Sequence, residues 1–205
     1  PYVATGEILG ALHSKPLAAS TSPTSQDIFQ TFSNRISRVR RRDTLIERIE
    51  TWFANQSPGA QQDAFVHGNC ALKNLIVDKD HRIGLLDFET SGHGNPYIDL
   101  GMLSRDFILC QTAPGLPARR AKRCLHAMLS RYHRATAIDE QQLHLYTTLF
   151  VVGHYLQIHR VKQIRESIAG LPVWRSKLEG LVNKLISDAA FDWLEFPRSP
   201  ISTSA

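Results

Sequence analysis

The stretch from Phe65 to Gly101 constrains the fold of this 205-residue chain more than any other. Turn-forming residues lie at 78–81, and short apolar runs precede and follow them, at 64–66, 75–77 and 83–86. Apolar runs bounded by turn formers are typical of a β-hairpin. We therefore predict a small hairpin within residues 64–90, in which the first run leads into a polar loop.

The predicted hairpin brings this polar loop close to the residues that leave its far end. The loop carries Asn69 and Asn74, while Asp87 and Glu89 follow the last strand. Two side-chain amides and two carboxylates therefore converge without help from the rest of the chain. Hard oxygen ligands of this kind suit Mg²⁺, which takes one or two carboxylates together with phosphate oxygens and water. The pattern indicates a magnesium site.

The motifs around this site follow one another in a defined order: His67-Gly68-Asn69, then Asn74, then Asp87-Phe88-Glu89, then Gly94-Asn95-Pro96 with Asp99-Leu100. This order resembles that of the aminoglycoside phosphotransferase and choline kinase-like family. The family's pattern is HGD, four residues and N, then a hairpin, then DFE or DWE, then GDP followed by DL. Each piece alone is a weak signal, whereas the shared order, spacing and intervening hairpin are a strong one.

The resemblance implies an α+β, mainly helical fold, the C-terminal lobe of a protein kinase-like protein with a short β-hairpin at the catalytic site. We expect this lobe to span residues 1–196, with the hairpin at 64–90 and a flexible tail at 197–205. A helix expected at 4–13 ends in a Leu-His pair, as does the family helix that follows the hinge between lobes. We therefore expect the N-terminal lobe to be absent, so that a missing lobe or a partner chain would supply the phosphate-pairing lysine and most of the adenine pocket.

Residue by residue, the resemblance implies a role for each motif position. Asn74 and Asp87 hold Mg²⁺ against the phosphates of ATP or GTP, and Glu89 sits beside that metal. Asp99 braces the catalytic loop through hydrogen bonds. His67 could be read as a general base, but in the family it orients the loop.

Asn69 stands where the family has its catalytic Asp, and an amide cannot take a proton at neutral pH. General-base catalysis is worth roughly 10²–10⁴-fold, whereas phosphoryl transfer depends mostly on positioning and charge stabilisation. We therefore expect impaired turnover in this chain, with metal–nucleotide binding able to survive. An engineered substitution, a natural pseudoenzyme and a site that uses another base all account for Asn69.

Lys73 and Cys70 are neighbours of Asn74 and Asn69 and are further candidate residues of the site. Lys73 could contact a phosphate as a point charge, or it could project into solvent. Cys70 is a candidate reactive thiol, although nothing near it in the sequence obviously lowers its pKa.

Composition restricts the remaining classes. The three scattered cysteines have no CxxC spacing, which favours a reducing compartment over structural zinc. No apolar run reaches the roughly 18 residues of a membrane span and no signal peptide opens the chain, so the cytoplasm is the expected location. The net charge of +5 favours anionic ligands without requiring nucleic acid. It also counts against a polycationic acceptor such as an aminoglycoside, since no acidic cluster stands out downstream.

Most of the chain outside this stretch is predicted to be helical. Apart from the helix at 4–13, helices are expected at 27–38, 43–55, 100–109, 118–133, 143–158 and 173–193. The arginine-rich segment from Arg35 to Arg42 is either a solvated helix face or a contact for an acidic partner or substrate. His144, His154 and His159 are spaced too far apart to share a metal, so we predict core or surface histidines.

These observations lead to two functions of different classes. The first is an ATP- or GTP-dependent phosphotransferase that moves the γ-phosphoryl group to a hydroxyl of a small molecule. The alternative is a pseudokinase-type binding or scaffold module that uses the arginine-rich face for a partner. A protein-directed kinase is a third, weaker interpretation, and the motif His67-Gly68-Asn69 counts against it. The sequence does not identify the acceptor.

Overall fold

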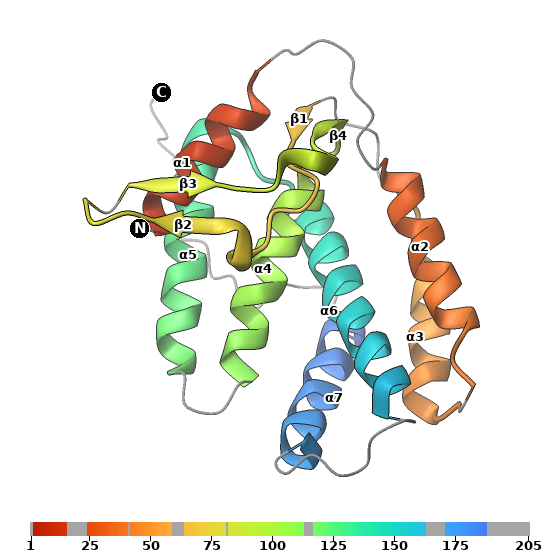
Figure 1. The fold of residues 1–205 in the computed structure, drawn as a ribbon. Helices are drawn as coiled ribbons and strands as arrows, with labels where there is room; N and C mark the ends of the chain where they lie inside the picture. The colour runs from red at the N-terminus through yellow and green to blue at the C-terminus, as the bar shows by residue number, and fades with distance from the viewer. Residues whose placement is uncertain are drawn as a thin grey trace, which may run out of the picture.

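The computed structural model describes residues 2–15, 24–40, 42–58, 64–80, 82–112, 117–162 and 171–187. Over these residues the fold is mainly helical, as predicted, and it contains two small sheets (Figure 1). The helices are α1 (Tyr2–His13), α2 (Ser25–Ser37), α3 (Thr44–Ala54), α4 (Tyr97–Thr112), α5 (Ala118–Ala135), α6 (Glu140–Lys162) and α7 (Leu171–Ser187). The predicted tail at 197–205 lies outside the described residues, as does the end of the helix expected at 173–193.

Side-chain caps set where α2 and α3 begin. Thr24 accepts a hydrogen bond from the Asp27 N–H, and the Asp27 carboxylate accepts one from the Thr24 N–H. This reciprocal capping box starts α2 at Ser25, two residues before the start expected from the apolar pattern. Asp43 caps α3 by accepting from the Ile46 N–H at 3.0 Å, which confirms the predicted start of that helix.

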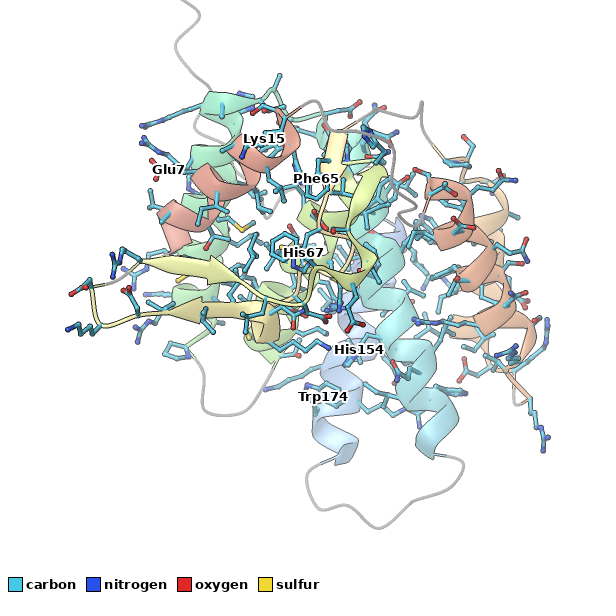
Figure 2. The ribbon with its side chains drawn as sticks, turned by 45° about the horizontal axis from the view of Figure 1, so that its top comes forward. Glu7, Lys15, Phe65, His67, His154 and Trp174 are labelled. Atoms are coloured by element: carbon cyan, nitrogen blue, oxygen red, sulfur yellow. The ribbon has the colours of Figure 1, made fainter. Side chains whose placement is uncertain are left out.

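Two antiparallel strand pairs form the sheets. The predicted hairpin is present as β2 (Leu75–Val77) and β3 (Ile83–Leu85), with Leu75 opposite Leu85. β1 (Ala64–Val66) does not join this hairpin, because it pairs with β4 (Gly92–Gly94) in a second sheet. The sequence analysis missed β4, since Gly-His-Gly lacks the β-branched and aromatic residues that mark a strand. Figure 2 shows Phe65 in β1 and His67 just beyond its end.

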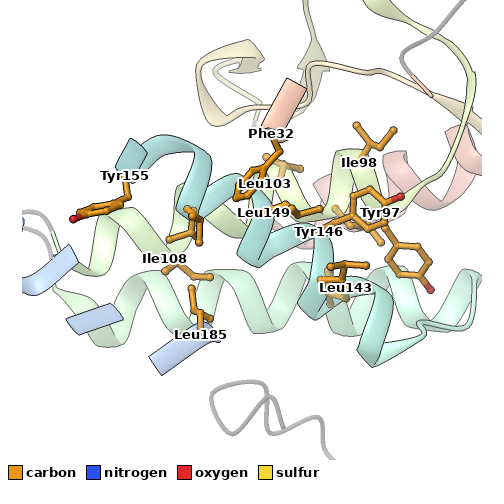
Figure 3. Packing of buried hydrophobic residues seen from close by; sticks show 14 of the residues in the cluster. Phe32, Tyr97, Ile98, Leu103, Ile108, Leu143, Tyr146, Leu149, Tyr155 and Leu185 are labelled. Atoms are coloured by element: carbon orange, nitrogen blue, oxygen red, sulfur yellow. The ribbon is translucent and has the colours of Figure 1, made fainter. Parts of the chain in front are cut away.

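The core lies around α4 and α6, which pack against each other along much of their length. The apolar segment predicted at 143–158 is the inner part of α6, and it supplies the fully buried Tyr146, Val151 and Tyr155. α4 contributes Leu103 and Ile108, α2 contributes Phe32 and α7 contributes Leu185 (Figure 3). Burying large apolar side chains on several helices is the main stabilising term for such a bundle.

The remaining helices cover this centre from several sides. α5 packs on α4 and α1 packs on α5, while α2 contacts α6 and α3 contacts α7. The hairpin projects from one side of the molecule, and its inner end meets the segment between β1 and α4 (Figure 1). Among the described residues, no helix is both long and apolar enough to cross a membrane.

Candidate active site

Asp99, in the first turn of α4, anchors the loop that follows β1. Its fully buried carboxylate accepts the His67 N–H at 2.6 Å, the Gly68 N–H at 2.9 Å and His13 Nε2 at 3.2 Å. Because a carboxylate only accepts, Nε2 of His13 carries a proton, and its Nδ1 lies 2.8 Å from the Tyr132 hydroxyl. Three donors thus compensate a buried charge that would be costly without them.

His67 is held through both nitrogens of its ring. Nε2 donates to the Leu86 carbonyl at 2.7 Å, and Nδ1 accepts the Asn69 N–H at 3.3 Å. The ring also packs against Phe88, with ring centroids 4.6 Å apart. One buried side chain therefore ties the loop to the end of the hairpin, and both its nitrogens are used inside the protein.

Asn69, Asn74 and Asp87 come together at the inner end of the hairpin. Asn69 Nδ2 donates to Asp87 Oδ2 at 2.7 Å. Asn74 Nδ2 donates to the Asn69 carbonyl at 2.8 Å and lies 3.4 Å from the same Asp87 oxygen. Asp87 has a φ of 67°, a left-handed conformation that is uncommon outside glycine and marks functional sites. The structure thus brings together three of the residues predicted to form the site.

Glu89 and Lys73 lie at the edge of this cluster. Glu89 is exposed in the 3₁₀ turn Phe88–Thr90 and makes no hydrogen bond with a described residue. Lys73 is exposed in the 3₁₀ turn Leu72–Asn74, immediately before the buried Asn74. Neither side chain takes part in the hydrogen bonds that join the loop to the hairpin.

Asp106 is a supporting residue that the sequence analysis missed. Its Oδ2 accepts the Leu72 N–H at 2.8 Å, and its Oδ1 pairs with Arg105 at 2.7 Å. Asp99 and Asp106 are seven residues apart and therefore lie on the same face of α4. This spacing of seven residues was the signal available in the sequence. In the structure, the two carboxylates on one helix face hold the two ends of one loop.

Comparisons with known proteins identify the family of this chain. The model of the phosphotransferase enzyme family matches residues 2–144, which include the loop, the hairpin and Asp99. The chain belongs to the phosphotransferase enzyme family. A search of curated proteins finds no match.

Solved structures of phosphotransferases and kinases share the fold. A choline kinase from Streptococcus pneumoniae has a TM-score of 0.57 at 14% identity, over 91% of this chain and 63% of its own. A macrolide 2'-phosphotransferase from Brachybacterium faecium has a TM-score of 0.53 at 17% identity, over 89% and 59%. An aminoglycoside phosphotransferase from Streptomyces rimosus has a TM-score of 0.51 at 21% identity, over 72% and 59%. This chain thus spans less than two thirds of the length of these family members.

The oxygen donors at the loop fit the magnesium expected in a phosphotransferase. The Asn69 carbonyl holds the amide nitrogen of Asn74, so the amide oxygen is the atom that remains for a cation. The Asp87 carboxylate supplies the second donor, and Mg²⁺ is usually held by one or two carboxylates with phosphate oxygens. Over the described residues there is no group of three or more His, Cys, Asp or Glu that could hold a metal.

Gly68 fits the loop only because it has no side chain. Its φ is 76°, and a Cβ at this position would overlap the backbone carbonyl of Thr90. We expect Gly68→Ala to lower the free energy of unfolding by more than about 1 kcal/mol. Gly180→Ala in α7 is the matched control, because a Cβ there meets open space. This substitution should raise the free energy of unfolding by about 0.5–1 kcal/mol. Urea unfolding of both variants measures this difference, and an unchanged or stabilised Gly68→Ala protein would contradict it.

Cys70 is not the reactive thiol that its position suggested. The side chain is fully buried, and burial raises its pKa well above the usual range, with Asp99 and Asp106 adding to the effect. A buried thiol with a raised pKa reacts slowly, because the thiolate is the nucleophile. We expect iodoacetamide to modify the half-buried Cys110 and Cys124 first, as followed by peptide mass spectrometry. Modification of Cys70 before the other two in the folded protein would show that the loop opens.

Proposed function

We propose that this chain carries the phosphate-binding site of a small-molecule phosphotransferase, which transfers the γ-phosphoryl group of ATP or GTP to a hydroxyl group. The observation that carries the proposal is the convergence of Asn69, Asn74 and Asp87 at the inner end of the hairpin. Membership of the phosphotransferase enzyme family supports the reaction class. Because the chain spans less than two thirds of its structural relatives, the activity is proposed for the whole protein.

Each residue of the cluster has a distinct part in this proposal. The Asn74 amide oxygen and the Asp87 carboxylate would hold Mg²⁺, which would supply positive charge against the negative charge that develops during transfer. Glu89, in the adjacent turn, would support the metal. The exposed Lys73 can reach a phosphate as a flexible point charge. His67 and Asp99 keep the loop in position for transfer.

Asn69 weakens this site in two ways. It offers no proton acceptor to an incoming hydroxyl, which removes general-base catalysis. Its amide also donates to Asp87 Oδ2, so a neutral group occupies one lone pair of the proposed metal ligand. A cation must compete with this hydrogen bond. We therefore infer slow turnover and weaker metal binding than the same site would have with Asp at position 69.

Calorimetric titration with Mg-ATP and Mg-GTP tests the proposal and distinguishes the two nucleotides. Asp87→Asn is expected to lower the affinity by at least about 10-fold, because even supporting residues of metal sites contribute that much. Asp80→Asn is the matched control, since it makes the same charge change at the exposed tip of the same hairpin. Equal affinities of the unaltered protein and Asp87→Asn would place the nucleotide elsewhere and overturn the proposal.

A further inference from the structure

A second candidate site lies between α2, α4 and α6. It is a cavity of about 230 Å³. Its apolar wall comes from all three helices and includes Phe32, Met102, Leu149 and Phe150. Cavities of this kind, mainly apolar with a few polar groups, are typical of small-molecule sites.

The charged groups that line this cavity are basic. Arg35 from α2, Arg105 from α4 and His154 from α6 line it, and no Asp or Glu does. Arg105 lies over the Phe150 ring, 6.0 Å from the centroid, and is paired with Asp106. Burial and the charge of Arg105 lower the pKa of His154, so this ring is neutral near pH 7. The cavity therefore carries a positive charge from Arg35 that no described carboxylate neutralises through an ion pair.

Arg35 lies where α2 packs on α6. Its guanidinium lies against Gly153, where a Cβ would be 3.0 Å from Nη1. The end of the Arg35 side chain therefore contacts α6 at Gly153. Within the arginine-rich segment, Arg35, Arg38 and Arg40 are all exposed and Arg42 pairs with Glu50, while Arg41 lies outside the described residues. Of the arginines described in that segment, Arg35 alone lines the cavity.

The cavity is adjacent to the candidate active site through α4. Arg105 lines the cavity, and the next residue, Asp106, holds the Leu72 N–H of the Asn69–Asn74 loop. Figure 2 shows His154 of α6 below His67 in that view. A molecule in the cavity would therefore contact Arg105, the neighbour of the residue that holds this loop.

We propose that this cavity binds the acceptor, and that it selects a small molecule with an apolar body and an anionic group, a carboxylate or a phosphate. The role as acceptor site rests on the proposed function, whereas the selection for an anion rests on the cavity itself. Arginine recognises both anions through paired N–H donors. A polycation or a quaternary amine would meet the positive charge of Arg35, which no described carboxylate pairs with.

Ligand-observed NMR with probes of similar size tests the selection. The anionic probes are phenylbutyrate and phenyl phosphate, and their matched controls are phenylbutanol and phenylbutylamine. We expect both anions to bind more tightly than the alcohol and the amine, and the tighter of the two to identify the preferred anion. Equal binding of the amine or the alcohol, or no binding of either anion, would overturn the proposal.

Variants in α2 test whether Arg35 is the residue that binds the anion. Arg35→Gln is expected to weaken anion binding by about 10-fold through the loss of a charged hydrogen bond. Arg35→Lys keeps the charge and should recover part of the affinity. Arg38→Gln removes an exposed arginine of the same segment that does not line the cavity, and should bind as the unaltered protein does. An unchanged affinity of Arg35→Gln would place the anion elsewhere and overturn the assignment.

The two proposals fail separately. Absence of Mg-ATP binding in the unaltered protein would overturn the proposed function and leave the anion preference of the cavity standing. Absence of the anion preference, with Mg-ATP binding retained, would overturn this inference alone.

Discussion

Asp99→Asn is expected to lower the free energy of unfolding by about 3–5 kcal/mol, the usual cost of breaking a buried charged network. The carboxylate accepts the His67 N–H and His13 Nε2 on one oxygen and the Gly68 N–H on the other. An amide has one oxygen, so in either orientation its NH₂ group faces at least one buried N–H donor. An unpaired donor of this kind loses its hydrogen bond and remains cut off from water.

Thermal and urea unfolding measure this loss. For a chain of this size the melting temperature should fall by roughly 6–20 °C, at about 2–4 °C for each kcal/mol. Asp106→Asn is the matched control on the same face of α4. Asp106 accepts one backbone N–H of the loop and its side chain is 19% exposed, so we expect a loss near 1 kcal/mol. Similar losses in the two variants would contradict the role of Asp99 as the main anchor.

Asn69→Asp is expected to raise phosphoryl transfer by about 10²–10⁴-fold, because the introduced carboxylate can take the proton of the acceptor hydroxyl. Steady-state assays with Mg-ATP and anionic hydroxyl compounds measure the gain. Asn69→Ala is the control, since it removes the hydrogen bond to Asp87 without adding a base. An equal rate in the two variants would show that position 69 is not the limiting feature. Retained Mg-ATP binding together with no turnover would then favour the binding-module alternative.

The same substitution has a second readout that does not depend on turnover. Asn69 Nδ2 now lies 2.7 Å from Asp87 Oδ2, so the introduced carboxyl would face a like charge at this distance. Like charges raise the pKa of the introduced group in the folded state. A raised folded-state pKa means that stability is present below the ordinary Asp pKa of about 3.9 and is lost as the pH rises above it.

Magnesium should reverse this loss. At neutral pH we expect Asn69→Asp to be less stable than the unaltered protein in EDTA, by about 1.4 kcal/mol for each unit by which the pKa rises. Mg²⁺ between the two carboxylates should restore the stability, whereas Asn69→Ala should respond little. A melting temperature of Asn69→Asp that is the same with EDTA and with Mg²⁺ would contradict a metal site at Asp87.

Several features of this protein follow from short segments of sequence. Asp43 begins α3, the residues 75–85 form a hairpin and the apolar stretch at 143–158 is buried in α6. Each depends on neighbours within a few residues, on capping, turn formation or periodicity. The spacing of the loop motif and of Asp87 relative to the hairpin likewise predicted that Asn69, Asn74 and Asp87 lie close together.

Other features depend on contacts between distant segments. β4 is a strand because β1 lies beside it, and Cys70 is buried because the loop is folded against the rest of the protein. His13 reaches Asp99 across 86 residues of sequence, and Arg35 of α2 lies against Gly153 of α6. Capping, turns and periodicity act between near neighbours and can be read along the chain. Burial and charge pairing depend on which helices pack together, and that arrangement exists only in the folded protein.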